Sequence, residues 1–247
     1  MSLNAIIDII TEYALLLLKG VGVTLLLSII GTIIGLLIAF VFSIIRVQSI
    51  NPYDSKIINV IKRIGIGFVK TYVTIIRGTP MIVQAVLFYY GFQQIGIRWS
   101  PLMAGLFTVS VNTAAYLTEV LRGGIQSVDK GQLEAARAIG MNQRKAMFLV
   151  VIPQALKNSF ASIGNELIVN IKDTAVLNII AVVDLFTVTK SAAGKTYFYM
   201  EAMLIAAAIY LFLTYFSSKG KGRATQLLHS IPLAFKSALT PFSSFSQ

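Results

Sequence analysis

The stretch from about Tyr13 to Ile45 is almost entirely apolar, and Lys19 is its only charged residue. About 20 apolar residues are enough for a helix to cross the hydrocarbon core of a bilayer, so this stretch can span it and should tilt or project beyond it. Lipid offers the backbone no hydrogen bonds, which favours an α-helix. Gly31 and Gly35 put two small residues on one helix face, either for close approach of a second helix or as glycines that a membrane helix simply tolerates.

The whole chain has the composition of a polytopic helical membrane protein. Of its 247 residues 56% are hydrophobic and only 13% are charged, whereas a soluble domain carries about 25% charged residues. The net charge of +11 does not indicate nucleic-acid binding, because the basic residues fall in short loops between apolar spans. The absence of cysteine and the single His229 argue against a disulfide scaffold and a metal site. The N-terminus lacks a basic region and a cleavage site, so we expect no removable signal peptide.

We predict five membrane spans, with the second interrupted at Arg77-Gly78-Thr79-Pro80. Their expected ranges are about 13–45, 64–92, 101–121, 160–186 and 197–216. Between them lie a loop from Arg46 to about Arg63 with a turn at Asn51-Pro52, a short polar loop at 93–100, and a polar insert at 122–157. Residues 1–216 form the expected membrane domain, and 217–247 form a basic tail, either amphipathic on the membrane surface or disordered.

Charge predicts how the chain is oriented in the membrane. Fifteen of the 21 Lys and Arg residues lie in 46–70, in the insert and in the tail, whereas the other side has only Arg98, Lys190 and Lys195. Short loops rich in Lys and Arg stay in the cytoplasm. We therefore expect the N-terminus outside and the insert and the C-terminus in the cytoplasm.

The insert reads as a short helix, a sharp turn and a second helix. Asp129 and Gln132 have the spacing of a capping box, and Gly140 suits the left-handed residue that ends a helix. Asn142 can cap the second helix, which we expect to close before Pro153. Taken alone, this pattern fits either a docking surface for a cytoplasmic partner or an amphipathic connector on the membrane surface.

The sequence resembles the permease subunits of ATP-binding-cassette (ABC) importers, and among them the polar amino acid permeases of the histidine, glutamine and arginine type. The matching residues are Tyr72, Arg77-Gly78-Thr79-Pro80, Gln84, Tyr89-Tyr90-Gly91, Ala115-Tyr116, Glu119, Arg122-Gly123-Gly124-Ile125, Gly131-Gln132-Leu133-Glu134-Ala135-Ala136, Gly140, Pro153-Gln154, Asn165 and Lys172-Asp173-Thr174. The chain departs from the family at Ala175, where a serine is usual, and in its longer tail.

This resemblance implies an all-α type I ABC importer permease fold in the inner (cytoplasmic) membrane of a prokaryote. The insert would be the EAA loop, whose coupling helices sit in a cleft of a separate ABC ATPase subunit. The implied ATPase-coupling residues are Gly131, Glu134, Ala135, Ala136, Gly140 and Pro153. The other implied partners are a second permease chain, identical or similar, an external amino acid-binding protein and membrane lipid. We expect this chain to bind no cofactor, because it has no phosphate loop, and ATP and Mg would be used by the ATPase.

Ionisable residues at membrane depth are costly and therefore mark candidate functional sites. Glu166 and Asp173 are seven apart on one expected helix face, and Gly78 and Pro80 can break a helix so that its backbone binds a polar solute. The candidate substrate-binding residues are Gly78, Thr79, Pro80, Glu166, Asp173 and Thr174. Arg77, Glu119, Arg122 and Lys172 are candidate structural or gating charges, and we expect Glu119 to pair with Arg122. The alternative is that Arg77, Glu166, Lys172 and Asp173 pair with one another.

We therefore predict the transmembrane subunit of an ATP-driven importer for polar amino acids. The rival hypothesis is a secondary amino acid transporter driven by an ion gradient, which would share the intramembrane charges but would not need the cytoplasmic insert. A third hypothesis, a coupling scaffold without a pathway, would leave Glu166 and Asp173 without a role.

Overall fold

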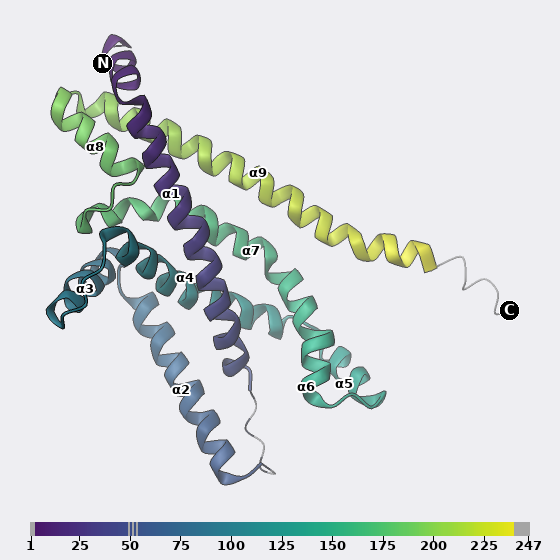
Figure 1. The fold of residues 1–247 in the computed structure, drawn as a ribbon. Helices are drawn as coiled ribbons and strands as arrows, with labels where there is room; N and C mark the ends of the chain where they lie inside the picture. The colour runs from purple at the N-terminus through teal and green to yellow at the C-terminus, as the bar shows by residue number, and fades with distance from the viewer. Residues whose placement is uncertain (1–2, 49, 51, 53, 240–247) are drawn as a thin grey trace.

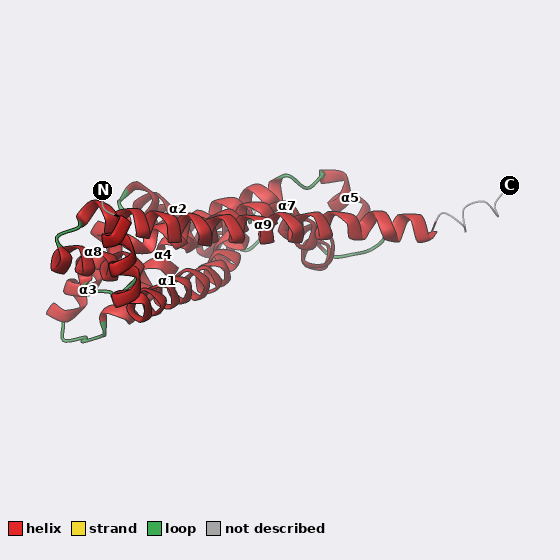
Figure 2. Cartoon of the chain, turned by 90° about the horizontal axis from the view of Figure 1, so that it is seen from above, coloured by secondary structure: helices red, strands yellow, loops and turns green. Residues whose placement is uncertain are grey.

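The computed structural model describes residues 3–48, 50, 52 and 54–239, with side chains as far as Leu227. The described residues form helices and no strand, as Figure 2 shows by colour. The α-helices are α1 (Leu3–Arg46), α2 (Lys56–Gly78), α3 (Met81–Gln94), α4 (Pro101–Gln126), α5 (Lys130–Ala138), α6 (Gln143–Ala146), α7 (Ile152–Asp173), α8 (Leu185–Thr196) and α9 (Tyr199–Leu239). A π-helical turn, η1 (Met147–Val151), joins α6 to α7, and a 3₁₀ segment, η2 (Thr174–Ile180), follows α7.

Three helical segments of the described chain are long and apolar enough to cross a membrane: Leu3–Arg46, Gln143–Ile180 and Tyr199–Leu227. The pair α2 and α3, bent by 110° between Gly78 and Met81, counts as a fourth span if it is taken as one broken span. The remaining expected span, α4, is 26 residues long but carries Asn112, Glu119 and Arg122 among other polar residues, which lower its hydropathy. Length and composition thus support three or four spans, and the count of five stays a prediction.

Helices α1 and α4 pack at the centre of the bundle, and they approach closely at the two glycines of the first span (Figure 1). A Cβ on Gly31 would lie 2.5 Å from Val109 Cγ1. A Cβ on Gly35 would lie 2.8 Å from the Thr113 side chain and 3.0 Å from the Ser110 carbonyl oxygen. Of the two interpretations of these glycines, the structure shows the close helix contact, because only a residue without a side chain lets the two backbones come this near.

A buried asparagine joins α7 to the same pair of helices. Asn170, only 3% exposed, donates hydrogen bonds of 2.9 Å to Thr32 Oγ1 on α1 and to Thr113 Oγ1 on α4. The Thr32 hydroxyl in turn donates to the Ser28 carbonyl at 2.6 Å. Hydrogen bonds between helices are effective in lipid, where apolar contact provides little driving force. This network fixes α7, which carries Glu166 and Asp173, against α1 and α4.

Several expected boundaries differ from those of the structure. Helix α2 begins at Lys56 and not near Ile64, because the Ser55 hydroxyl caps it by accepting from the Ile58 amide at 3.3 Å. The expected turn at Asn51-Pro52 lies partly outside the described residues, since Asn51 is not among them. The expected span at 160–186 is wrong as a single helix. Its α-helix ends at Asp173, η2 ends at Ala181 in a left-handed conformation, and the buried Asp184 caps α8 by accepting from the Thr187 amide at 2.9 Å.

Helix α9 continues past the expected end of the last span at 216 and reaches Leu239 (Figure 1). The division into a membrane domain at 1–216 and a tail at 217–247 stays a prediction. So does the apolar face expected for the tail, because it falls almost wholly on side chains outside the described set. The short helices α5 and α6 lie at the end of the molecule away from the N-terminus and α8 (Figure 1).

Candidate functional site

The break between α2 and α3 is held by one buried glutamine. In a continuous helix the Ile76 carbonyl would accept from the amide of residue 80, but Pro80 has no N–H. Gln84 Nε2 replaces it, donating to the Ile76 oxygen at 2.8 Å and to both the carbonyl and the hydroxyl oxygen of Thr79 at 2.9 Å. Gln84 Oε1 accepts from Asn112 Nδ2 on α4 at 3.0 Å. The bend is therefore a built feature, anchored to the neighbouring helix.

The predicted substrate-binding residues of the break lie on its exposed side. Gly78, Thr79 and Pro80 are all exposed, and a Cβ built on Gly78 would meet nothing within 4 Å. The Thr79 hydroxyl is already engaged, since it donates to the Ile75 carbonyl at 2.9 Å and accepts from Gln84. There is open space beside the break for a small solute, next to the backbone of Gly78.

Charges of both signs lie near this space. Glu166 and Asp173 flank Asn170 on α7, and the Asn170 side chain donates to Thr113 on α4, one turn before Tyr116. Arg77 lies over the ring of Tyr116 on α4, with its guanidinium carbon 5.2 Å from the ring centre. Within the described part of the chain, no ion pair within 4.0 Å links Arg77, Glu166, Lys172 or Asp173. The alternative in which these four residues pair directly is not the arrangement seen, and their contact with a solute stays a prediction.

Thr174 lies differently from the other candidates. Its side chain is fully buried, and its hydroxyl donates to the Ile171 carbonyl at 3.2 Å, one turn back. Asp173 and Lys172, its neighbours, are exposed. The role of Thr174 in binding stays a prediction, and its hydroxyl does not point into the same space as Asp173.

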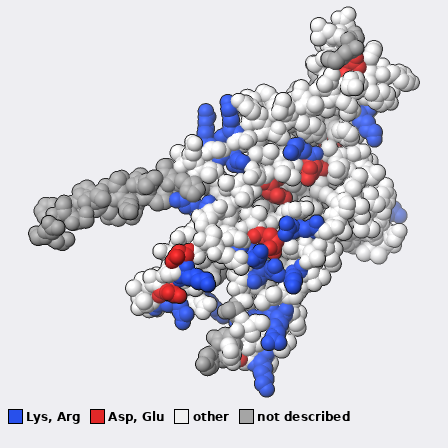
Figure 3. Space-filling model, turned by 180° about the vertical axis from the view of Figure 1, so that it is seen from behind, with Lys and Arg blue, Asp and Glu red and all other residues white. Residues whose placement is uncertain are grey.

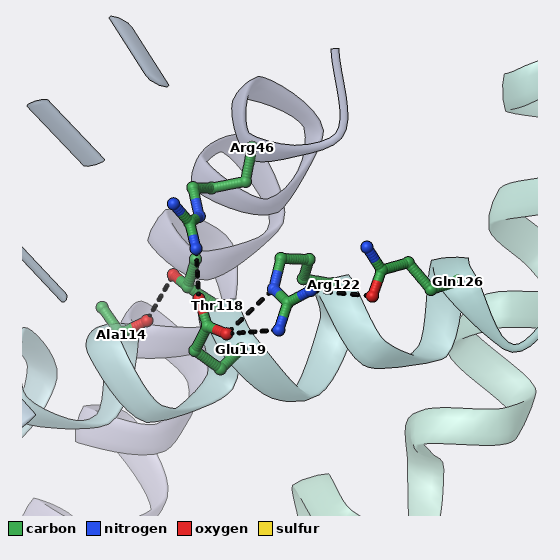
Figure 4. A network of polar contacts seen from close by, with 6 residues as sticks. All are labelled: Arg46, Ala114, Thr118, Glu119, Arg122 and Gln126. Atoms are coloured by element: carbon green, nitrogen blue, oxygen red, sulfur yellow. Dashed lines mark hydrogen bonds and ion pairs between the residues drawn. The ribbon is translucent and has the colours of Figure 1, made fainter. Parts of the chain in front are cut away.

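Glu119 forms the best-connected charge cluster of the described chain (Figure 4). Its Oε2 accepts from Arg122, with the shortest contact at 2.7 Å, as expected, and its Oε1 accepts from Arg46 on α1 at 3.1 Å. Arg122 also donates to Gln126 Oε1 at 2.7 Å. The cluster joins the last turn of α1 to α4 just before the insert.

The insert has the local structure that its sequence predicts, with one difference in the cap. Asp129 caps α5 by accepting from the Gly131 amide at 2.8 Å and not from that of Gln132. Gly140 has φ +89°, and the Gly140 and Met141 amides donate to the Arg137 and Ala136 carbonyls at 3.0 and 3.1 Å. These two bonds form a Schellman motif, which stops α5 and turns the chain. Asn142 then caps the next helix by accepting from the Lys145 amide at 2.9 Å.

The second helix of the insert does not close before Pro153, so that expectation is wrong. Helices α6 and α7 are joined without a gap through the π-helical turn η1, and Pro153 lies in the first turn of α7. Pro153 directly follows the wider π-helical turn, in which the Ile152 amide donates five residues back to the Met147 carbonyl. The chain can therefore continue as a helix past a residue that has no amide donor. The Gln154 side chain donates to the Val150 carbonyl at 2.9 Å. The insert is thus mechanically continuous with α7 and its two acidic residues.

The predicted coupling residues divide between an outer and an inner face of α5. Gly131, Glu134, Ala135 and Gly140 are exposed, whereas Ala136 is only 5% exposed and packs inside the chain. Ile139 is 78% exposed beside Gly140. The exposed part of α5 and its turn thus combines short side chains with the Glu134 carboxylate, the Arg137 guanidinium and Ile139, and its role as a docking surface stays a prediction.

A comparison with family models decides what this arrangement belongs to. Residues 55–220 match the family described as the binding-protein-dependent transport system inner membrane component. The chain belongs to this family. It is therefore a transport subunit, and Glu134-Ala135-Ala136 fits the EAA motif of these permeases. The family description places its members in the inner membrane.

Relatives and solved structures agree with this assignment. The permease is 34% identical over 198 residues to the arginine transport system permease protein ArtQ of Bacillus subtilis, covering 80% of this chain and 85% of the relative. It is 35% identical over 224 residues to the nopaline transport system permease protein NocM of Agrobacterium fabrum, covering 86% and 88%. A chain in a crystal structure of an amino acid ABC transporter with histidines is 36% identical, with a TM-score of 0.76 over 88% of the permease and 96% of that chain. A chain of the MetNI methionine ABC transporter, 20% identical with a TM-score of 0.72 over 88% and 98%, shares the fold.

Two residues of the site had no predicted role. Gln84 was part of the resemblance. Its function follows from Pro80, which has no N–H and so leaves the carbonyl of Ile76, four residues earlier, without its helical donor until Gln84 supplies one. Arg46 was assigned only to the positive loops, and its partnership with Glu119 depends on how α1 crosses α4. The first residue could be found from the spacing of Ile76, Pro80 and Gln84, but the second could not, because no spacing relates it to Glu119.

Proposed function

We propose that this permease carries polar amino acids into a prokaryotic cell, with the space beside the α2–α3 break as part of the substrate pathway. The observation that carries the proposal is an exposed helix break beside charges of both signs that form no ion pair within the described residues, Arg77 on α2 and Glu166 and Asp173 on α7. An amino acid is a zwitterion, which needs an acceptor for its ammonium group and donors for its carboxylate. The names of the similar permeases support this class of solute.

In this proposal each charge has a task. Glu166 and Asp173 accept from the ammonium group or from a cationic side chain, and the backbone beside Gly78 together with Arg77 holds the carboxylate. We propose that the insert and the C-terminus lie in the cytoplasm and the N-terminus outside, and the distribution of Lys and Arg supports this orientation by the positive-inside rule. Five spans result if α4 and the bent pair each cross the membrane.

The proposed assembly comprises two permease chains, identical or similar, an external amino acid-binding protein and a pair of ABC ATPase subunits that use ATP and Mg. The outer face of α5 docks in a cleft of the ATPase. Because η1 joins the insert to α7 without a break, a push on α5 and α6 is transmitted along α7 toward Glu166 and Asp173. ATP-driven closure thereby changes the access of the pathway, and hydrolysis resets it. The family assignment leaves the rival, a gradient-driven carrier, without support.

The solute is tested by reconstituting the permease with its ATPase in vesicles and adding liganded binding protein across a panel of polar amino acids. We expect ATPase stimulation and uptake with at least one amino acid that carries both charges. Stimulation without uptake of any amino acid in the panel would contradict the proposed solute class while leaving the transporter assignment in place.

The coupling role of the insert is tested at Gly140. A valine there would be forced into a left-handed conformation, which costs about 1–2 kcal/mol for a residue with a Cβ and opens the turn between α5 and α6. We expect Gly140→Val to lower substrate-driven ATPase stimulation about tenfold or more, since the helices leave their docking geometry. The measurement is the ATPase rate with liganded binding protein divided by the rate without it.

Gly140→Asn is the matched control, because asparagine tolerates the left-handed region. It should retain most of the coupling. Normal coupling in a well-folded Gly140→Val protein would show that the turn does not set the docking geometry.

A further inference from the structure

Helix α2 carries four basic residues at a strict interval of seven. Lys56, Arg63, Lys70 and Arg77 are all exposed. Seven residues fall about 20° short of two full helical turns, so the four lie on one slowly winding face over about 31 Å of helix. We refer to these four residues as the basic face of α2. Figure 3 shows that Lys and Arg atoms of the described residues gather mainly over the lower half of one side of the molecule.

The basic face has no partner within the described residues. Neither an ion pair nor a side-chain hydrogen bond engages any of its four members, and the single contact is that of Arg77 with the Tyr116 ring. Lys62, on the same helix, behaves differently, because it pairs with Asp54 at 2.6 Å. Four separate cations must therefore be solvated from outside this chain.

Helix α2 has two further faces, which account for its other surroundings. Val69, Val73 and Ile76 are buried against α4 and the end of α1. Ile61, Phe68 and other apolar residues are 63% exposed or more on a second face, which suits lipid. Phe68 and Lys70 are two residues apart, so they point about 200° apart around the helix. A helix with a packed face, an apolar face and a basic face is typical of one placed between the bundle, lipid and water.

Neither lipid nor a second copy satisfies the basic face. Headgroups of the cytoplasmic leaflet can reach Lys56 at the start of the stripe, but Arg77 lies about 31 Å further along the helix, close to the hydrocarbon thickness of about 30 Å. The same face on a second permease would bring like charges together, which is costly. Water, with small anionic groups in it, can solvate all four residues. The stripe also leads to the helix break, because Arg77 lies in the last turn of α2.

We propose that Lys56, Arg63, Lys70 and Arg77 form one wall of the aqueous route below the α2–α3 break, a positively charged wall that attracts the carboxylate of the passing solute. The identity of the solute in this inference rests on the proposed function, whereas the basic wall itself rests on the four residues of α2. An acidic wall at Glu166 and Asp173 and a basic wall on α2 would orient a zwitterion as it leaves the break.

The wall is tested by thiol labelling, for which the permease is suited because it has no cysteine. Lys70→Cys and Arg63→Cys are compared with Phe68→Cys and Ile61→Cys, which lie at similar depth on the apolar face. The full complex without nucleotide, in inside-out vesicles, is treated with a negatively and a positively charged methanethiosulfonate of similar size. We expect the two basic-face positions to react at least about tenfold faster, because the thiolate forms only in water.

The remaining cations should also bias the choice of reagent. The quantity compared is the labelling rate of the negatively charged reagent divided by that of the positively charged one. At Lys70→Cys this ratio is expected to be about fivefold higher than with a free thiol, since a charged cleft concentrates counter-ions. Adding Arg63→Gln should reduce this preference, whereas Lys62→Gln, at the paired lysine, should not.

Equal labelling of both faces, or slower labelling at Lys70 and Arg63 than at Phe68 and Ile61, would overturn the wall. Labelling without a preference for the negative reagent would overturn its attraction for carboxylates. Neither readout depends on which solute is carried, so a failure here is distinct from failure of the uptake assay. Size-exclusion profiles identify misfolded variants, and the two pairs of positions are independent of each other.

Discussion

A Gly35→Leu permease is expected to lose most of its folded protein. The first atom of the new side chain already falls 2.8 Å from the Thr113 side chain and 3.0 Å from the Ser110 carbonyl oxygen, and the backbone oxygen cannot rotate away. Overpacking a tight contact costs about 1–3 kcal/mol, and more where backbone must move. Because Thr113 also accepts from Asn170, pushing α4 away from α1 would break the link to α7 as well.

The measurement is the yield of monodisperse protein and its thermal midpoint in detergent. Gly22→Leu is the control on the same helix, since a Cβ there meets nothing within 4 Å. It should behave like the unmodified permease. Equal yields and midpoints for the two variants would mean that the α1–α4 contact does not require glycine at position 35.

The second large effect is expected from Gln84→Leu. The leucine has similar size but leaves the Ile76 and Thr79 carbonyls without their donor and the Asn112 amide without its acceptor. Hydrogen bonds between side chains in membrane proteins contribute about 0.6–1.7 kcal/mol each, so we expect a loss of about 2–4 kcal/mol. The bend between α2 and α3 should loosen, and uptake should fall with stability.

The thermal midpoint and the uptake rate in vesicles are measured together for this variant. Gln93→Leu, at an exposed position of the same helix, is the matched control and should leave both unchanged. An unchanged midpoint in Gln84→Leu would show that water satisfies the Ile76 carbonyl, and that the glutamine does not hold the break.

The sequence by itself determined the features that depend on local spacing. Gly140 predicts the left-handed turn and Asn142 predicts the cap that follows, whereas the Gly31 and Gly35 pair left a close helix contact as one of two alternatives. Pro80 predicts the break after Gly78, because a missing N–H and a fixed φ act within one turn of the chain. The resemblance to the family rested on short patterns of the same kind, which occur in one order along the chain.

Only the tertiary structure decided which distant residues meet. Glu119 was expected to pair with Arg122 three residues away, but its bond to Arg46 depends on the crossing of α1 and α4. Packing also decided two features of α7. Thr174 is buried at the end of this helix, and α6 continues into its start through η1. Local preferences act within a few residues, whereas the free energy of packing depends on contacts between segments that no spacing specifies. The sequence therefore determined where the chain bends and turns, and the packing of α1, α4 and α7 decided which charges are paired.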